Sequence, residues 1–359
     1  MPDHPARLAN LRAALADREL DQLLVTNLVN ARYLAGFTGT NGALVVTAGE
    51  AVLFTDFRYM AQAAEQAPGF EIVDGGHAAR QALAERILEI GGRAGFDDAD
   101  MRVQAHAALV GAIADGVEMV PAAGLVERLR SIKDSAEIAS ISAAARLADS
   151  IYDALAERGL AGRRERDVAW QIELLAHELG AEGLSFPPIV AAGPHGALPH
   201  AHPRDAPIPP GELVVLDLGV IVDGYCSDAT RTFASGNVSD HAREIFDIVA
   251  TAQRAALDAI APGIECKAVD AAARDVIDGA GYGGRFGHST GHGVGLEVHE
   301  RPTLAARSED SLEPGHVVTV EPGVYIPGEL GVRIEDLIVV EAGGPRILSL
   351  ASKDLLVVD

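Results

Sequence analysis

Apolar residues follow two alternating patterns along the first third of the chain, one with the spacing of a helix and one typical of short strands. The elements predicted from these patterns are a helix over residues 6–18, a strand at Gln22–Thr26 and a strand pair at Ala43–Thr47 and Ala51–Thr55. Around Pro121–Gly124 the pattern changes from strand-like to helix-like, through residues that favour turns. We therefore expect a small α/β domain over residues 1–122 and a second domain over residues 123–359.

The second domain contains a pattern of two helices followed by a hairpin, and this pattern occurs twice. Asp134 followed by Glu137 resembles a capping box, which predicts the start of a helix that ends near Arg158. The other predicted elements are helices at Glu165–Leu179, Asp240–Ala261 and Lys267–Gly279, and strands at Leu213–Val222, Tyr225–Phe233, Val317–Glu321 and Val332–Val340. We therefore expect an α+β fold whose second domain is a duplicated unit, each half ending in an acidic hairpin.

A buried acidic residue marks the first predicted hairpin. Asp217 lies in the apolar segment Leu213–Gly219, where an ionised carboxylate is costly unless a cation compensates its charge. The pair Asp223-Gly224 is typical of a two-residue turn, and such a turn places residue 217 opposite residue 230. Asp228 is then a diagonal neighbour on the same sheet face, roughly 7–8 Å away, so both carboxylates are expected to face one site. Taken alone, this hairpin also fits a local hydrogen-bonding role for Asp228.

The second hairpin adds two more acidic residues and favours a metal site. Glu321 follows the apolar strand Val317–Val320, and Glu335 lies in the next apolar strand. His292 lies nearby in the glycine-rich segment Gly291–Gly295. Four carboxylates and one imidazole, without a thiolate, suit two divalent ions such as manganese, cobalt or zinc. Because a pair of such ions activates water and polarises a carbonyl group, the pattern predicts a hydrolase.

Composition and charge exclude several classes of partner. Lys and Arg number 29 against 52 Asp and Glu, and the formal net charge of -23 disfavours binding to nucleic acid or to an anionic membrane surface. The two cysteines, Cys226 and Cys266, are not spaced as a metal or redox motif. The chain start lacks the pattern of a signal peptide, and the most apolar run, Leu213–Val222, is too short to span a bilayer. We therefore expect a cytoplasmic protein.

Five segments of the second domain follow one another in the order VLDLG, GYCSDATRTF, GHSTGHGVGLEVHE, TVEPGVYI and GVRIEDLIVV. In sequence and in order, they resemble the pita-bread metallopeptidases, in particular the prolidase and Xaa-Pro aminopeptidase branch. Two segments of the first domain, NARYLAGF and FTDFRY, are similar to the creatinase-type N-terminal domain of the same branch. The resemblance implies a pita-bread catalytic domain preceded by a smaller α/β domain.

The resemblance also implies a set of five metal ligands. Asp217 and His292 correspond to residues that each bind one ion, whereas Asp228 and Glu335 correspond to residues that bridge both ions. Glu321 corresponds to a ligand that also acts as general acid and base for the activated water. The resemblance favours manganese. Cobalt and zinc are alternatives, because this ligand set accepts all three metals.

Four further residues match substrate-facing positions of the family. His200 and His299 resemble histidines that contact the substrate and stabilise the reaction intermediate. His288 resembles a histidine that lines the proline pocket. Arg333 resembles an active-site arginine linked to the ligands, and its alternative role is a surface ion pair, which contributes little to stability.

The resemblance implies hydrolysis of peptides that carry proline in the second position. Many prolidase-like relatives have Arg directly after a His-Glu-x-Pro segment, and a bidentate Arg suits the free carboxylate of a dipeptide. This chain reads His299-Glu-Arg-Pro-Thr303 instead, so we expect an Xaa-Pro aminopeptidase, with an Xaa-Pro dipeptidase as the alternative. Arg301 and Arg307 lie close enough in sequence to replace the missing Arg.

Other classes fit the sequence less well. A non-enzymatic pita-bread binding module is the main alternative from another class, but such relatives have lost their metal ligands and all five are present here. Creatinase-like chemistry without metal leaves four convergent acids unexplained, and methionine aminopeptidases usually lack the additional N-terminal domain. Because the family's N-terminal domains commonly complete the active-site mouth of a neighbour, the resemblance also implies a homodimer.

Overall fold

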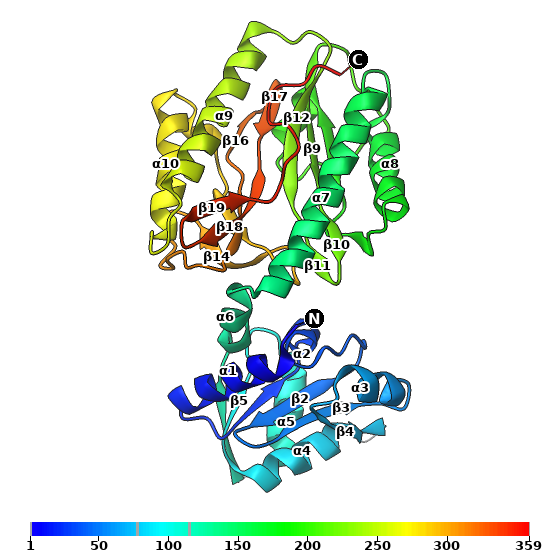
Figure 1. Ribbon diagram of the computed structural model, residues 1–359, viewed down its shortest axis with the longest axis vertical. Helices are drawn as coiled ribbons and strands as arrows, with labels where there is room; N and C mark the ends of the chain where they lie inside the picture. Colours follow the sequence, from blue (N-terminus) through cyan, green and yellow to red (C-terminus); the bar gives the residue numbers. More distant parts are fainter. Residues whose placement is uncertain (1, 77–78, 114–115, 359) are drawn as a thin grey trace. The chain divides into compact units, whose positions relative to one another are not determined.

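The computed structural model describes residues 2–76, 79–113 and 116–358 and contains two compact units, Met1–Arg130 and Ser131–Asp359 (Figure 1). The division falls near the end of helix α6 (Leu125–Ser131), whereas the sequence pattern places the domain boundary before this helix. The first unit includes most of α6 because Arg130 donates a hydrogen bond to Asn30 at 2.8 Å and Tyr33 donates to the Leu129 carbonyl at 3.2 Å. A turn-forming segment thus precedes α6 without separating it from the first unit.

The described part of the first unit contains a six-stranded mixed sheet in the order β4-β3-β2-β1-β5-β6. Its strands are β1 (Gln22–Val25), β2 (Ala43–Thr47), β3 (Ala51–Thr55), β4 (Glu71–Asp74), β5 (Gly92–Phe96) and β6 (Val117–Pro121). Its helices are α1 (His4–Asp17), α2 (Leu28–Ala35), α3 (Met60–Gln66), α4 (Ala79–Ile90) and α5 (Val103–Ile113). The predicted hairpin of β2 and β3 is confirmed, with Leu44 opposite Leu53 in an antiparallel ladder.

The second unit begins with the predicted capping box. The Asp134 carboxylate accepts hydrogen bonds from the first turn of α7, and the Glu137 side chain bonds back to the Asp134 N–H at 2.9 Å. The helices are α7 (Ser135–Arg158), α8 (Glu165–Glu178), α9 (Asp240–Ala259) and α10 (Cys266–Gly279), with 3-10 turns η3 (Gly193–Ala197) and η4 (Gly283–Arg285). Figure 1 shows α7 and α8 on one side of the strands and α9 and α10 on the other, as a duplicated α+β unit predicts.

The strands between these helix pairs are short and frequently interrupted. They are β7 (Gly183–Leu184), β8 (Ile189–Ala192), β9 (Glu212–Leu218), β10 (Val220–Val222), β11 (Tyr225–Cys226), β12 (Ala229–Ser235), β13 (Gly291–Gly293), β14 (Glu300–Leu304), β15 (Val317–Val320), β16 (Gly323–Ile326), β17 (Leu330–Arg333), β18 (Asp336–Glu341) and β19 (Gly344–Ile347). Their apolar side chains pack against the helices in two main cores, one with α7 and α8 and one with α9 and α10. The interruptions decide where the polar side chains lie.

The first acidic hairpin has the predicted register and one unpredicted break. Asp223 and Gly224 have φ angles of 52° and 80°, as a two-residue turn of this kind requires, and Asp217 lies opposite Thr230. The ladder is broken at Gly219, where a Cβ atom would lie 1.9 Å from the Ser227 carbonyl oxygen. Asp228 follows directly after this close approach and so lies at the break, outside regular strand.

The second acidic hairpin is broken in the same way. Val320 pairs with Asp336 in the β15–β18 ladder, and Gly323 pairs with Arg333 in the β16–β17 ladder. Both ladders keep one register, so Glu321 and Glu335 lie opposite each other in the gap between them. Each half of the duplicated unit therefore presents acidic side chains at a break in its hairpin.

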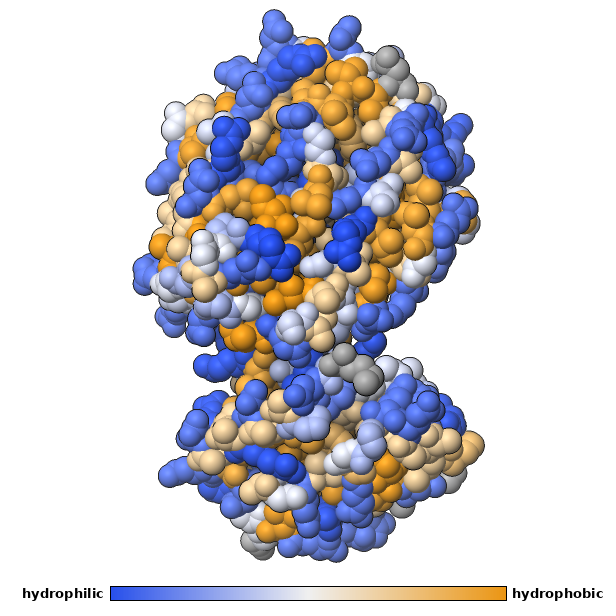
Figure 2. Space-filling model, in the orientation of Figure 1, coloured by the Kyte–Doolittle hydropathy of each residue, from blue (hydrophilic) through white to orange (hydrophobic). Residues whose placement is uncertain are grey.

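Hydrophilic and apolar residues alternate over the surface, and the helices are short or polar. On the face drawn in Figure 2, hydrophilic residues are spread over both units, with apolar residues between them. Within the described ranges, no helix combines the length and the apolar character that a membrane span needs.

Replacement of His316 by glutamine is expected to reduce the acid sensitivity of the fold. His316 Nδ1 accepts a hydrogen bond from the Glu313 N–H at 3.0 Å, and burial together with nearby Lys133 lowers the histidine pKa to about 4. The folded state therefore favours the neutral ring. This contribution is fully present above the unfolded pKa of 6.5 and is lost as the pH falls towards about 4.

Between about pH 7 and pH 4, the wild-type free energy of unfolding should fall by roughly 3 kcal/mol more than that of the glutamine variant. Urea unfolding of both proteins in chelator, at a series of pH values, measures this difference directly. Parallel pH curves for the two proteins would show that His316 titrates normally in the fold.

Candidate metal centre

A cavity of about 630 Å³ lies in the second unit, with both apolar and ionisable side chains on its walls. It is lined by all nine residues that the sequence identifies as ligands or substrate-facing groups: His200, Asp217, Asp228, His288, His292, His299, Glu321, Arg333 and Glu335. Phe186, Pro187 and Ile189 add an apolar wall that was not predicted from the sequence. An apolar wall beside a few convergent polar groups is typical of a site for a small ligand.

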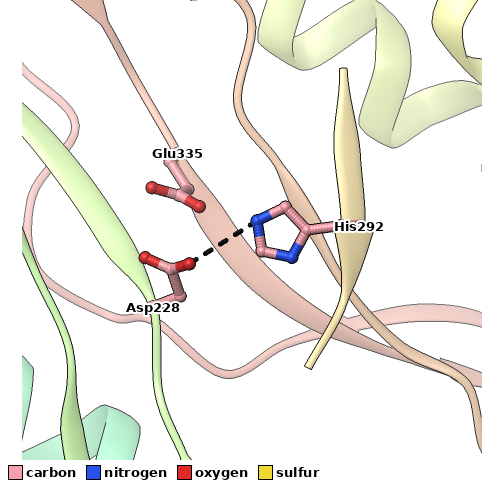
Figure 3. Close-up of side chains that lie close together, drawn as sticks. All are labelled: Asp228, His292 and Glu335. Carbon is pink, nitrogen blue, oxygen red and sulfur yellow. Dashed lines mark ion pairs between the residues drawn. The ribbon is translucent and has the colours of Figure 1, made fainter. Parts of the chain in front are cut away.

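Three of the expected ligands converge inside this cavity. Asp228, His292 and Glu335 each offer one ligand atom, and these atoms all lie within 4.8 Å of one another (Figure 3). The Asp228 Oδ2 atom is 3.6 Å from His292 Nε2, and the Glu321 Oε1 atom is 3.3 Å from the same nitrogen. The two broken hairpins and the β13 strand thus direct four of the expected ligands towards one point.

The orientation of His292 leaves one ring nitrogen for a cation. Its Nδ1 lies 3.1 Å from the Gly293 carbonyl oxygen, which only accepts, so Nδ1 is the donor. Nε2 of the neutral ring then faces carboxylate oxygens of Asp228 and Glu321, and these also only accept. A cation shared by the three groups satisfies all of them, and a hydrogen bond on the outer nitrogen is the usual support of a metal-binding histidine.

Asp217 is compensated on only one of its two oxygens. The residue is buried, and its Oδ2 accepts a hydrogen bond from Arg333 Nη2 at 2.5 Å. Its Oδ1 is also buried, but it has no hydrogen-bond partner among the described residues. Because an unpaired buried carboxylate oxygen is costly, this atom points to a cation as its missing partner.

The carboxyl groups also raise one another's proton affinity. Burial and the charge of Glu335 raise the pKa of Asp228 well above its usual range, and burial and the charge of Glu321 do the same for Glu335. Burial raises the pKa of Glu321 as well, but without a metal ion the protonated form of His292, whose own pKa Glu321 raises, outweighs this effect and lowers the Glu321 pKa to about 2. The cavity therefore concentrates more negative charge than its own cationic groups balance.

These observations fit divalent metal ions. The donors are carboxylate oxygens and one imidazole nitrogen, a set that suits manganese, cobalt or zinc in the absence of thiolates. Asp228, His292 and Glu335 are close enough to share one ion, and Glu321 approaches the same imidazole. Asp217 has a buried oxygen available for a further ion.

Arg333 connects three walls of the cavity. Besides its bond to Asp217, its Nη1 donates to the Pro199 carbonyl at 3.1 Å and to the Tyr325 hydroxyl at 2.9 Å. The Tyr325 hydroxyl lies 2.9 Å from His288 Nε2, whose ring donates through Nδ1 to the Ser289 carbonyl. Arg333 is therefore a buried connecting residue, and the alternative of a surface ion pair is wrong.

Tyr325 and Thr230 were not predicted from the sequence as site residues, although the strand register indicates both. Tyr325 lies two residues after the partner of Arg333, so it is on the same sheet face as that arginine. Thr230 lies opposite Asp217, and its hydroxyl donates to Glu335 Oε2 at 2.7 Å and accepts from Arg333 Nε at 2.9 Å. Thr230 thereby orients one expected ligand and one expected substrate-facing residue.

The remaining histidines line the cavity at different depths. The ring centroids of His299 and His292 lie 4.4 Å apart in an edge-to-face arrangement. Burial, together with the charge of nearby His292, lowers the pKa of His299. Burial also lowers the pKa of His288, which agrees with a neutral ring bonded to Tyr325. His200 and His299 are both exposed, and His200 lies on the loop that follows η3.

Neither arginine proposed as a carboxylate anchor lines the cavity. The Arg301 side chain is 54% exposed and lies 3.7 Å from Asp310, and Arg307 is exposed as well. Thr303 does line the cavity. Among the described lining residues, Arg333 is the one guanidinium, and its donors are already used by Asp217, Thr230, Pro199 and Tyr325.

Two protein families match the chain. Metallopeptidase family M24 matches residues 139–342, and the creatinase/prolidase N-terminal domain matches residues 7–132. The first match contains all nine of the residues named above, and the second lies almost wholly in the first unit.

Individual relatives extend this likeness to most of the chain. A solved Xaa-Pro dipeptidase from Bacillus anthracis is 41% identical, with a TM-score of 0.96 over 99% of this chain and 100% of that chain. An X-Pro aminopeptidase from Thermotoga maritima is 32% identical, with a TM-score of 0.88 over 96% of this chain and 99% of that chain. An Xaa-Pro dipeptidase of Pyrococcus furiosus is 43% identical over 65% of this chain and 67% of that protein.

Proposed function

This chain belongs to metallopeptidase family M24, and we propose that within this family it is an Xaa-Pro dipeptidase. The family implies divalent metal ions and a metallo-exopeptidase activity. The observation that carries the dipeptidase assignment is the likeness to the Bacillus anthracis Xaa-Pro dipeptidase over almost the whole chain, which exceeds the likeness to the Thermotoga maritima aminopeptidase in both identity and TM-score. The preference for an aminopeptidase, which rested on Thr303, is therefore replaced by its alternative.

The ions would be held by the residues whose geometry fits them: Asp217, Asp228, His292, Glu321 and Glu335. When bound, they supply an activated water and polarise the scissile carbonyl. Glu321 is the base in this proposal, because its carboxylate lies beside the other proposed ligands, with Oε1 3.3 Å from His292 Nε2. Its Oε1 accepts from the Thr319 hydroxyl at 3.3 Å, which leaves its second oxygen to take a proton and pass it to the proline nitrogen of the leaving group.

The histidines have separate tasks in this proposal. His299 lies against His292, and its low pKa favours a neutral ring that donates a hydrogen bond to the scissile carbonyl. His200 reaches the substrate from the opposite loop. His288, fixed by Tyr325, lies beside Phe286 and provides a wall for the proline ring.

The end of the substrate is held without a dedicated arginine. The exposed lining residues His202 and Thr303 offer an imidazole and a hydroxyl for a free carboxylate. A single imidazole and a hydroxyl bind a carboxylate less strongly than a bidentate arginine does. For this reason an Xaa-Pro aminopeptidase remains the second candidate function.

Ala-Pro is expected to be hydrolysed with a kcat/KM at least about tenfold higher than that of Ala-Pro-Ala, a difference of roughly 1.4 kcal/mol in transition-state binding. The reason is that only the dipeptide places a carboxylate against His202 and Thr303. Both substrates are assayed with manganese added to the apoprotein. A higher kcat/KM for Ala-Pro-Ala would identify the chain as the aminopeptidase instead.

Two arginine variants serve as matched controls for this comparison. Arg301→Ala and Arg307→Ala should leave the ratio of the two kcat/KM values unchanged, since neither side chain lines the cavity. Loss of the dipeptide preference in either variant would assign carboxylate binding to that arginine.

Manganese as the native metal, a homodimer and a cytoplasmic location stay predictions, to be tested by metal analysis, sedimentation and cell fractionation.

A further inference from the structure

Glu165, at the start of α8, is a buried acid outside the cavity with an unusual number of partners. The residue is 1% exposed, yet its carboxylate accepts hydrogen bonds from three separate positions of the chain. The Ala192 N–H donates to Oε1 at 3.1 Å, and His195 Nδ1 lies 3.1 Å from the same oxygen. Arg204 donates through its N–H at 2.9 Å, through Nε at 3.0 Å and through Nη2 at 2.9 Å.

These partners lie before, within and after one loop. The loop consists of residues 193–203, is here called the His200 loop, and lies between Ala192 at the end of β8 and Arg204. A single carboxylate therefore holds the residue before the loop, a residue within its first turn and the residue after it. Because a buried ionised carboxylate is stable only when its hydrogen bonds are made, Glu165 favours the one loop conformation that supplies all of them.

The middle of the His200 loop belongs to the cavity wall. Pro199, His200, Ala201 and His202 all line the cavity, and the Pro199 carbonyl accepts the bond from Arg333 described above. The loop is thus fixed from the metal side by Arg333 and from the far side by Glu165. The loop is also packed, because a Cβ atom at Gly331 of β17 would lie 1.8 Å from the Gly196 carbonyl oxygen and Ala201 is buried beside Ile189 and Ala191. Glu165 adds a polar attachment at both ends of this loop.

We infer that Glu165 and Arg204 are positioning residues that hold His200 and His202 at the substrate, through hydrogen bonds made outside the cavity. The inference deepens the proposed function and rests on it, because the substrate is the Xaa-Pro peptide. Misplacement of a substrate-facing group by about 1 Å can cost roughly two orders of magnitude in rate. The ion pair is therefore expected to act on kcat while the metal ligands stay in place.

Arg204 is the exposed partner in this ion pair, and its replacement allows a test in the folded protein. The Arg204 side chain is 50% exposed, so Arg204→Ala removes two of its three bonds to Glu165 without opening the core. Arg166 is the matched control, because it is 55% exposed, lies in the same first turn and pairs with Asp205 instead of Glu165. Both substitutions remove one positive charge from the same neighbourhood.

Arg204→Ala should lower kcat for Ala-Pro by about tenfold or more, with unchanged manganese stoichiometry and faster amide hydrogen exchange in the His200 loop. Arg166→Ala should match the wild type in all three measurements. Glu165→Gln should show the same loss of kcat in the fraction that folds. A merely structural role of Arg204 would lower the melting temperature and leave kcat within twofold of the wild type.

Equal losses of kcat in Arg204→Ala and Arg166→Ala would overturn the inference, because the effect would then be one of charge. If the wild-type protein hydrolyses neither Ala-Pro nor Ala-Pro-Ala, the proposed function fails, and hydrogen exchange still decides the loop attachment. Unchanged exchange over residues 193–203 in Arg204→Ala would then refute it.

Discussion

Asp228→Ala will lower the number of metal ions bound per chain and reduce kcat for Ala-Pro by about three orders of magnitude or more. A ligand atom of Asp228 lies within 4.8 Å of ligand atoms of His292 and Glu335. Removal of the Asp228 carboxylate therefore takes away one of the three donors that can hold the same ion. Metal analysis after gel filtration and steady-state assays at saturating manganese measure the two effects. A variant that binds two ions and retains activity would show that Asp228 is not a ligand.

The same substitution should have opposite effects on stability with and without metal. Without metal, Asp228 is a buried acid beside other acids, so its removal should raise the melting temperature of the apoprotein. With metal, the wild type gains stability because the ion binds only the native state, and the variant gains less. Glu341→Ala, an exposed acid at the end of β18, is the control and should change neither value.

The first hairpin shows how far the sequence predicts this site. The Asp223-Gly224 turn sets the register, and the register places Asp217 opposite Thr230, as the structure confirms. The break at Gly219 was not predicted, because it depends on the close approach of the Ser227 carbonyl, a contact that a period-two pattern does not record. The α+β fold and the capping box of α7 were predictable because each rests on short-range patterns.

Contacts between distant segments were harder to predict. Glu165 reads in the sequence as an ordinary acidic residue in the first turn of a helix, and its bonds to Ala192 and Arg204 appear only when β8 and the following loop fold back onto α8. Likewise, Arg301 lies close enough in sequence to replace the missing Arg, but it is not among the lining residues of the cavity and its side chain lies near Asp310. Closeness in sequence does not decide which side chains reach the cavity.

Arg333→Met should reduce kcat for Ala-Pro by roughly two to three orders of magnitude, the range seen when a preorganised donor is lost from an active site. The guanidinium is buried and fixes Asp217, Tyr325 and the Pro199 carbonyl at once. Methionine fills similar space but donates no hydrogen bond. Kinetics on Ala-Pro, together with metal analysis, separate this loss from a loss of the ions.

Stability distinguishes Arg333 from Asp228, because the two substitutions change the charge of the cavity in opposite directions. Arg333→Met leaves the buried Asp217 carboxylate without its cationic partner, so the apoprotein should lose about 3–5 kcal/mol, the usual cost of breaking a buried pair. Added manganese compensates the same carboxylate and should restore more stability to this variant than to the wild type.

Arg333→Lys separates the charge of this residue from its geometry. Lysine keeps the positive charge beside Asp217, so most of the apoprotein stability should return. Its single ammonium group cannot reproduce the planar arrangement of donors that reaches Asp217, Thr230 and Tyr325 together, so kcat should stay at least about tenfold below the wild-type value. Recovery of both stability and kcat in Arg333→Lys would mean that the charge alone is needed and that the contacts to Pro199 and Tyr325 are incidental.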